Sequence, residues 1–340
     1  MEVTVLADAA LAVMWVGLTC YALFGGADFG AGVWDLVAGG AEQGRARRRL
    51  IEHSIGPVWE ANHVWLIFVV VMLWSAFSPV FAAVMSTLYI PLTLAALGII
   101  ARGAAFAFRK ASTELWQQRL FGACFALSSL LTPFFLGAVA GGVASGRVPP
   151  GLAAGDVVTG WLNPTSLLGG VLAVVTCAHL AAVYLCADAN RAGRPELASA
   201  FARDAVVTGS GAGVVALAGI AVLAADAPVL FHGLTHRALP LVVLSAVAGV
   251  AGIGLLIRRR YVAARAAAAL AVAAILWAWG AAQYPAMLVG STTVSQAAAT
   301  SSVLWAVLVS LGVGAVVLVP SLWLLYATFQ HEAPERSSPG

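Results

Sequence analysis

The groups that could carry out acid–base chemistry in this sequence are concentrated in its first third. They are Asp28, Asp35, His53, Glu60, His63 and Arg102. Most of them lie within or beside long apolar stretches, where an ionisable side chain is costly to place. Such groups are therefore functional candidates, and the carboxyl and imidazole groups among them could take up and release protons.

Glu60 and His63 form the most specific pair among these groups. They lie three residues apart in a stretch that favours a helix, so their side chains share one helix face. A partly desolvated carboxyl group beside an imidazole could form one station of a proton relay. An equally open interpretation is an inert Glu and His at the membrane boundary, with Trp59 and Trp65 as aromatic residues of the interface.

The segment 25–32 is rich in glycine and carries Asp28, which lies seven residues before Asp35. Glycine at this density indicates that the backbone approaches something bulky, and a neighbouring helix is a more frequent cause in membranes than a cofactor. We expect these glycines to loosen the end of the first span. The pattern is not a dinucleotide-binding fingerprint, because no strand precedes it.

The sequence around Arg102 and around the remaining histidines is less specific than the stretch that contains Glu60 and His63. Arg102 ends an apolar run, and it could extend to the lipid headgroups or pair with Glu60 or with an acidic group of a partner. His63 and His179 both lie in apolar spans, so haem ligation by the two is an alternative, although a hydrogen-bonded histidine is more frequent. His232 and His236, which lie four residues apart, are weaker candidates still for haem ligands.

The composition sets the environment of these groups. Hydrophobic residues make up 61% of the chain, charged residues make up 10%, and the mean hydropathy is +0.93. Soluble domains carry roughly 25% charged residues. Uniform apolar runs of roughly 20 residues favour membrane-spanning helices over barrel strands. The sequence therefore predicts an all-α integral membrane protein.

Nine transmembrane helices are predicted from the apolar runs, and nothing indicates a soluble domain. They lie at about 6–24, 58–77, 79–101, 120–141, 165–187, 205–225, 238–257, 261–280 and 302–327. We predict a single transmembrane domain over 1–329 and a polar tail over 330–340. The first span lacks the basic start of a signal peptide and is expected to be retained. The four cysteines show no metal-type spacing and are expected to be small buried apolar residues.

The basic residues alternate between the two sides of these nine spans. Fifteen of the 18 Lys and Arg residues fall in the first, third, fifth and seventh connections. Because positive residues tend to stay in the cytoplasm, the N-terminus is expected outside and the C-terminus inside the cell. A net charge of +3 makes a nucleic-acid surface improbable, and no metal site is expected.

One long motif resembles a known family. The run SIGPVWEANHVWLI at 54–67 is similar to the signature of subunit II of the cytochrome bd-type quinol oxidases. Shorter stretches agree in order with that family: GADFGAG at 26–32, LYIPL at 88–92, ARG at 101–103, FAFR at 106–109, TPFFLG at 132–137, NPTSLLGG at 163–170 and YPAM at 284–287. The family usually has Asp at the position of Glu60 and often another polar residue at that of His63. The resemblance therefore implies a divergent member.

The resemblance implies a fold and an activity. The fold is two four-helix bundles plus one peripheral helix, in a bacterial plasma membrane. The chain would pair with a subunit I that carries haems b and d and oxidises quinol, so that the complex reduces dioxygen to water. Small single-helix subunits, lipid and a quinone are further candidate partners, and no haem ligand is expected in this chain.

The resemblance also implies roles for particular residues. Glu60 would lie on a cytoplasmic proton route, which His63 and Asp28 would extend. Trp65 would lie near an oxygen route or the subunit interface, together with Trp59, Asn62 and Arg102. The alternative from a different class is a proton-coupled secondary transporter that uses Glu60 and His63 as its coupling pair.

Overall fold

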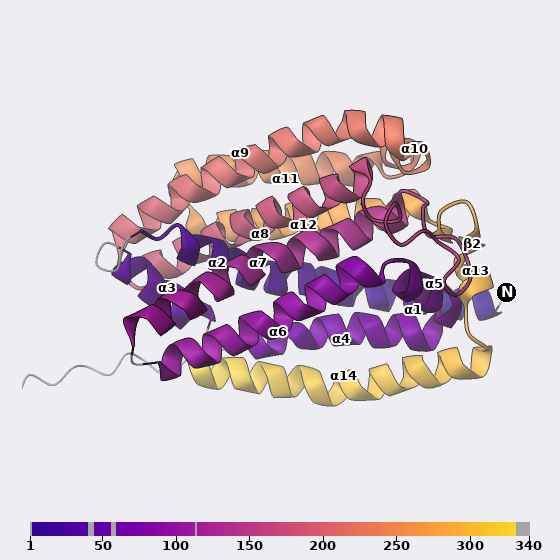
Figure 1. The fold of residues 1–340 in the computed structure, drawn as a ribbon, viewed down its shortest axis with the longest axis horizontal. Coiled ribbons are helices and arrows are strands. Elements are labelled where there is room, and N and C mark those ends of the chain that lie inside the picture. The colour runs from indigo at the N-terminus through magenta and orange to yellow at the C-terminus, as the bar shows by residue number, and fades with distance from the viewer. Residues whose placement is uncertain (1, 40–43, 56–58, 113, 331–340) are drawn as a thin grey trace, which may run out of the picture.

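The computed structural model describes residues 2–39, 44–55, 59–112 and 114–330, and Figure 1 shows long helices that run side by side along one axis. The elements in chain order are α1 (Glu2–Cys20), a π-helical turn η1 (Tyr21–Gly25), α2 (Gly26–Leu36), α3 (Arg45–Ile55), α4 (Trp59–Ala76), α5 (Ser78–Thr87), α6 (Tyr89–Ala111), α7 (Leu115–Ala144), α8 (Pro164–Arg191), α9 (Pro195–Asp226), α10 (Pro228–Thr235), α11 (Leu239–Ile257), α12 (Tyr261–Gln283), β1 (Ala286–Leu288), β2 (Thr292–Thr293), α13 (Val294–Ala297) and α14 (Ser301–Gln330).

The prediction of an all-α membrane protein is confirmed. Within the described residues, eight helices are long and apolar enough to cross a membrane, and the first of them runs through α1, η1 and α2. With its 18 residues α4 is about 27 Å long, which is close to the thickness of the hydrocarbon core. The small antiparallel pair of β1 and β2 lies in the connection between α12 and α14.

The expected span at 79–101 is wrong in its boundaries. The chain forms the short helix α5, breaks at Leu88, and starts the true span α6 at Tyr89. The reason is Pro91, whose ring would clash with the carbonyl group of Thr87 if one helix continued through both. Leu88 at the break is fully buried, so the bend between α5 and α6 is packed into the core.

Two groups of four helices form the body of the protein, as expected. One group contains α8, α9, α11 and α12, and the other contains the α1–α2 helix with α4, α6 and α7. Contacts of α7 and α2 with α8 join the two groups. Figure 1 shows α14 at the edge of the bundle, where it packs against α1 and α4 as the peripheral helix.

The chain stays helical through the glycine-rich segment to Leu36, after one π-helical turn at Tyr21–Gly25. The glycines of this segment let α2 lie directly against its neighbours. A Cβ atom on Gly30 would lie 1.8 Å from the backbone oxygen of Cys177 on α8, and one on Gly32 would lie 2.2 Å from Oγ of Ser129 on α7. The prediction that the close partner is a neighbouring helix is therefore confirmed.

The connections between the helices gather at the two ends of the bundle. Figure 1 places the N-terminus, α5, α10, α13 and β2 at one end, and α3 with its arginines at the other. At the first end, the Asp156 carboxylate accepts hydrogen bonds from the backbone N–H groups of Val158 and Thr159 at 2.9 and 2.7 Å. These bonds hold the pKa of that exposed carboxyl group below its ordinary value.

All four cysteines are free, and Cys177 and Cys186 are buried. The prediction of small buried apolar residues is therefore right for Cys177 and Cys186, whereas Cys20 and Cys124 are only half-buried.

Candidate functional site

The candidate site is built around a buried ion pair between α2 and α6. Arg102 donates from Nη1 to Oδ2 of Asp28 at 2.8 Å and from Nη2 to Oδ1 at 2.7 Å. It also donates to the backbone oxygen of Asp28 at 3.0 Å. Both side chains are only 2% exposed. Removing either partner would leave the other charge unpaired in an apolar interior, so the pair fixes α2 relative to α6.

A hydroxyl group and two aromatic rings complete the surroundings of Arg102. Its Nε donates to Oγ of Ser129 on α7 at 2.9 Å. Its Cζ lies 4.6 Å from the ring centroid of Phe125 and 5.1 Å from that of Phe29. Cation–π contacts of this kind stabilise a desolvated guanidinium group. The site therefore holds a fixed positive charge inside the bundle.

This geometry corrects the expectations for Arg102. The side chain does not extend to the lipid headgroups, because it is buried and held by Asp28. For the same reason it offers no surface to a partner subunit. Asp28 is the counter-ion of Arg102 in this arrangement.

A second pair repeats this arrangement nearer the α3 end. Arg109 Nη1 donates to Oδ2 of Asp35 at 2.8 Å, and its Nη2 lies 3.5 Å from Oε1 of Glu52 on α3. Each ion pair joins residues 74 positions apart, so α2 and α6 run parallel with the pairs about 10 Å apart along the helices. Arg109 is 21% exposed, so solvent screens this pair more than the buried one.

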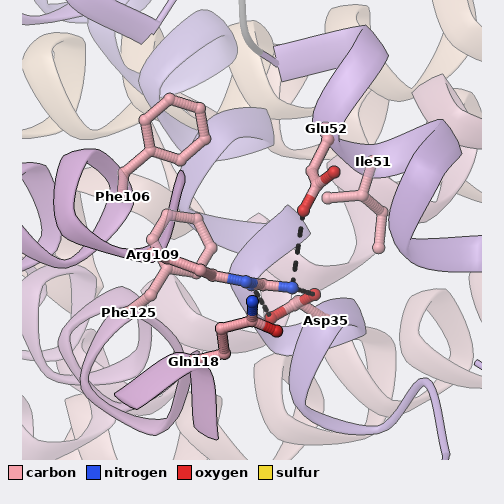
Figure 2. A pocket seen from close by; sticks show the side chains of 7 residues that line it. All are labelled: Asp35, Ile51, Glu52, Phe106, Arg109, Gln118 and Phe125. Carbon is pink, nitrogen blue, oxygen red and sulfur yellow. Dashed lines mark hydrogen bonds and ion pairs between the residues drawn. The ribbon is translucent and has the colours of Figure 1, made fainter. Parts of the chain in front are cut away.

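A pocket of about 290 Å³ lies beside the second pair. Its lining residues are Asp35, Ile51, Glu52, Phe106, Arg109, Gln118 and Phe125. Figure 2 shows Arg109 between the carboxylates of Asp35 and Glu52, with both rings on the same side of the pocket. Phe125 lines this pocket and also contacts Arg102. The pocket thus reaches the wall of the inner ion pair and is large enough for several water molecules.

The residues of the long motif lie at the start of α4. The side chains of Trp59 and Glu60 are outside the described part of the structure, so the shared face of Glu60 and His63 stays a prediction. His63 is half-buried, and its ring makes an edge contact with Phe29 at a centroid distance of 6.0 Å. Since Phe29 also lies against Arg102, the His63 ring is next to the buried ion pair.

Two other motif residues face the interior of the bundle. Asn62 is 7% exposed. Trp65 is partly buried and packs against the cluster of Tyr21, Phe29 and Cys177. Neither side chain has a position that identifies an oxygen route, so that role stays a prediction.

The structure does not bring His63 and His179 together as a haem site. Nδ1 of His179 lies 2.9 Å from the backbone oxygen of Ala205 on α9, and a Cβ atom on Gly209 would lie 2.8 Å from its ring. His179 therefore faces α9, whereas His63 faces Phe29 on α2. In the described residues no cluster of three or more His, Cys, Asp or Glu side chains could hold a metal ion. Among the described residues, His63 and His179 therefore do not form a bis-imidazole haem site.

His232 and His236 stack on one another at 3.9 Å between ring centroids, at the other end of the bundle from α3. Nδ1 of His236 lies 3.0 Å from the backbone oxygen of His232. Both rings are therefore involved in local contacts in and after α10.

Known proteins with similar sequences support one family. The family model described as cytochrome bd terminal oxidase subunit II matches residues 6–329. Cytochrome bd ubiquinol oxidase subunit 2 of Bacillus subtilis (strain 168) is 31% identical over 168 residues, which cover 49% of this chain and 48% of that protein. Cytochrome bd-I ubiquinol oxidase subunit 2 of Escherichia coli (strain K12) is 28% identical over 172 residues, which cover 48% and 44%. These alignments span about half the length of each curated relative.

Similarity in three dimensions extends over almost the whole chain. A chain in the structure of bd oxidase from Geobacillus thermodenitrificans superposes with a TM-score of 0.80 at 26% sequence identity. The superposition covers 97% of this chain and 100% of that one. A proton-coupled transporter is not favoured by these similarities. Because the family model spans nearly all the residues and the fold agrees, this chain belongs to the cytochrome bd terminal oxidase subunit II family.

Proposed function

We propose that this chain is the subunit of a quinol:oxygen oxidoreductase that supports a haem-bearing subunit I and supplies a proton route from the cytoplasm. The observation that carries the proposal is the charged and aromatic site between α2, α4, α6 and α7, where the charged side chains of Asp28 and Arg102 are buried. Membership of the cytochrome bd terminal oxidase subunit II family supports this proposal. Haems b and d in the partner would reduce dioxygen with electrons from quinol.

The distribution of basic residues gives the direction of the route. The α3 end carries the basic connections, so we assign it to the cytoplasm, with the N-terminus on the outer side and the C-terminus inside. Glu60 and His63 lie in the first two turns of α4, which follows α3 directly. Protons consumed in forming water would enter from this side, while quinol would release its protons outside. The reaction would therefore separate charge across the membrane.

Each group of the site has a distinct task in this proposal. Glu60 takes up a proton from the cytoplasmic side and passes it to His63, whose ring lies beside Phe29. Arg102 keeps a positive charge next to this route, and Asp28 balances that charge.

Replacing Glu60 with Gln tests this proposal. The Glu60→Gln variant keeps the shape of the side chain but cannot exchange a proton, so we expect quinol-driven oxygen uptake to fall by about tenfold or more. Haem content and assembly should stay unchanged. Glu196→Gln is the matched control, because Glu196 is exposed in the first turn of α9, away from the site, and is expected to leave turnover intact. Equal turnover of Glu60→Gln and wild type from pH 6 to 9, on the order of a thousandfold range in proton concentration, would remove Glu60 from the route.

A further inference from the structure

The first span contains a buried phenol group that the site described above does not use. Tyr21 is 7% exposed, and in the described residues its hydroxyl oxygen is buried without a hydrogen-bond partner. A buried hydroxyl group that makes no hydrogen bond costs free energy, and proteins usually satisfy such groups with a side chain or an ordered water molecule. The hydroxyl group is therefore a candidate to bind an ordered water molecule.

The backbone around Tyr21 is unusual as well. Residues Tyr21–Gly25 form the π-helical turn η1 between α1 and α2, inside a membrane-spanning helix. Single π-helical turns are rare and occur frequently at functional sites. A Cβ atom on Gly25 would lie 2.9 Å from Cε2 of the Tyr21 ring. The lack of a side chain at Gly25 therefore leaves room for the phenol in this position.

Tyr21 precedes the buried ion pair along the first span, on the side farther from α3. It is seven residues before Asp28, which corresponds to about 10 Å along the helix away from the α3 end. Tyr21 shares a buried cluster with Phe29, the same ring that contacts both Arg102 and His63. The phenol is also within electrostatic range of Asp28 and Arg102. Its surroundings are otherwise apolar, with Leu66, Ile99 and Leu136 packed against the cluster.

We propose that the hydroxyl group of Tyr21 binds a water molecule that continues the proton route from the level of His63 and Asp28 into the middle of the membrane. This inference rests on the proposed proton route. The phenol stays neutral throughout. It accepts a proton from the cytoplasmic side of the water chain as it donates its own to the water on the other side, so no bond other than O–H bonds forms or breaks. Tyr21 is thus a positioning residue for water and a relay.

The test uses the assembled oxidase with Tyr21→Phe, which keeps the ring and removes only the hydroxyl group. We expect oxygen uptake to fall by about fivefold, less than the loss for direct proton donors, and its pH profile to shift from that of the wild type. Density maps should show a water molecule within hydrogen-bond distance of Tyr21 Oη, absent from the variant. Tyr261→Phe is the matched control, since Tyr261 is 6% exposed and lies in the other helix group.

The outcomes separate this inference from the proposed function. If Glu60→Gln is slow and Tyr21→Phe has wild-type turnover, the proton route stands and the role of Tyr21 is wrong. If both variants have wild-type turnover, both proposals fail. A third outcome is a Tyr21→Phe enzyme that is slower but has the pH profile and the ordered water of the wild type. That result would show that Tyr21 acts through packing and would also overturn the inference.

Discussion

Replacing Asp28 with Leu is expected to destabilise the protein by about 3 kcal/mol or more, because it leaves Arg102 charged and unpaired in an interior where both side chains are 2% exposed. The guanidinium group would lose two hydrogen bonds to the carboxylate. Arg102→Met alone should cost a similar amount. Unfolding of the purified protein in a denaturing detergent series, followed by circular dichroism, measures the change.

The double variant distinguishes charge from packing. Asp28→Leu combined with Arg102→Met removes both charges, so we expect it to be more stable than either single variant. Asp35→Leu is the matched control in the second pair: Arg109 keeps Glu52 as a partner and is partly exposed to solvent. If Asp28→Leu and Asp35→Leu cost the same, or if the two inner replacements are additive, the buried pair does not have the structural role argued above.

Replacing Gly30 with Ala is expected to have the other large effect. A Cβ atom there would lie 1.8 Å from the backbone oxygen of Cys177, and a backbone group cannot rotate away as a side chain can. The helices α2 and α8 must therefore move apart, at a cost of about 2–3 kcal/mol. This movement would also disturb the Asp28–Arg102 pair on the same helix. We expect a lower melting temperature and a lower yield of assembled complex.

Gly26→Ala is the control for this prediction, because it changes the same helix one turn earlier. The nearest atoms to a Cβ there are Cδ1 of Leu180 at 3.4 Å and Sγ of Cys177 at 3.5 Å, which are ordinary contacts. The variant should remain within about 1 kcal/mol of the wild type. A Gly30→Ala protein as stable as Gly26→Ala would contradict the close packing of α2 on α8.

The sequence predicts most of the architecture because apolar runs and basic connections are local signals. Seven of the expected spans coincide with membrane-length helices apart from their ends, and the expected span 58–77 coincides with the 18-residue α4. The glycines around Asp28 correctly indicate close helix packing. The break before α6 can be predicted from the sequence, since Pro91 excludes a continuous helix through Thr87. Hydropathy does not indicate this break, because the residues on both sides of it are apolar.

The ion pairs of the site could not be derived from local patterns. Asp28 and Asp35 are seven residues apart, as are Arg102 and Arg109, and this common spacing was the signal that could have suggested paired faces. It becomes informative only once α2 and α6 are known to be parallel and in register. That fact depends on how α7 and α8 pack around α2. The sequence also gives no signal for the π-helical turn at Tyr21, because the residues Tyr21–Gly25 are apolar like the helix around them.

Purification of the membrane complex through a tag on this chain tests most directly the proposal that the chain is subunit II of a haem-bearing oxidase. We expect a second, haem-bearing chain to co-purify, with visible absorbance of reduced haems b and d and quinol-driven oxygen uptake. A colourless preparation of this chain alone, from membranes that do show quinol oxidase activity, would contradict the proposed function.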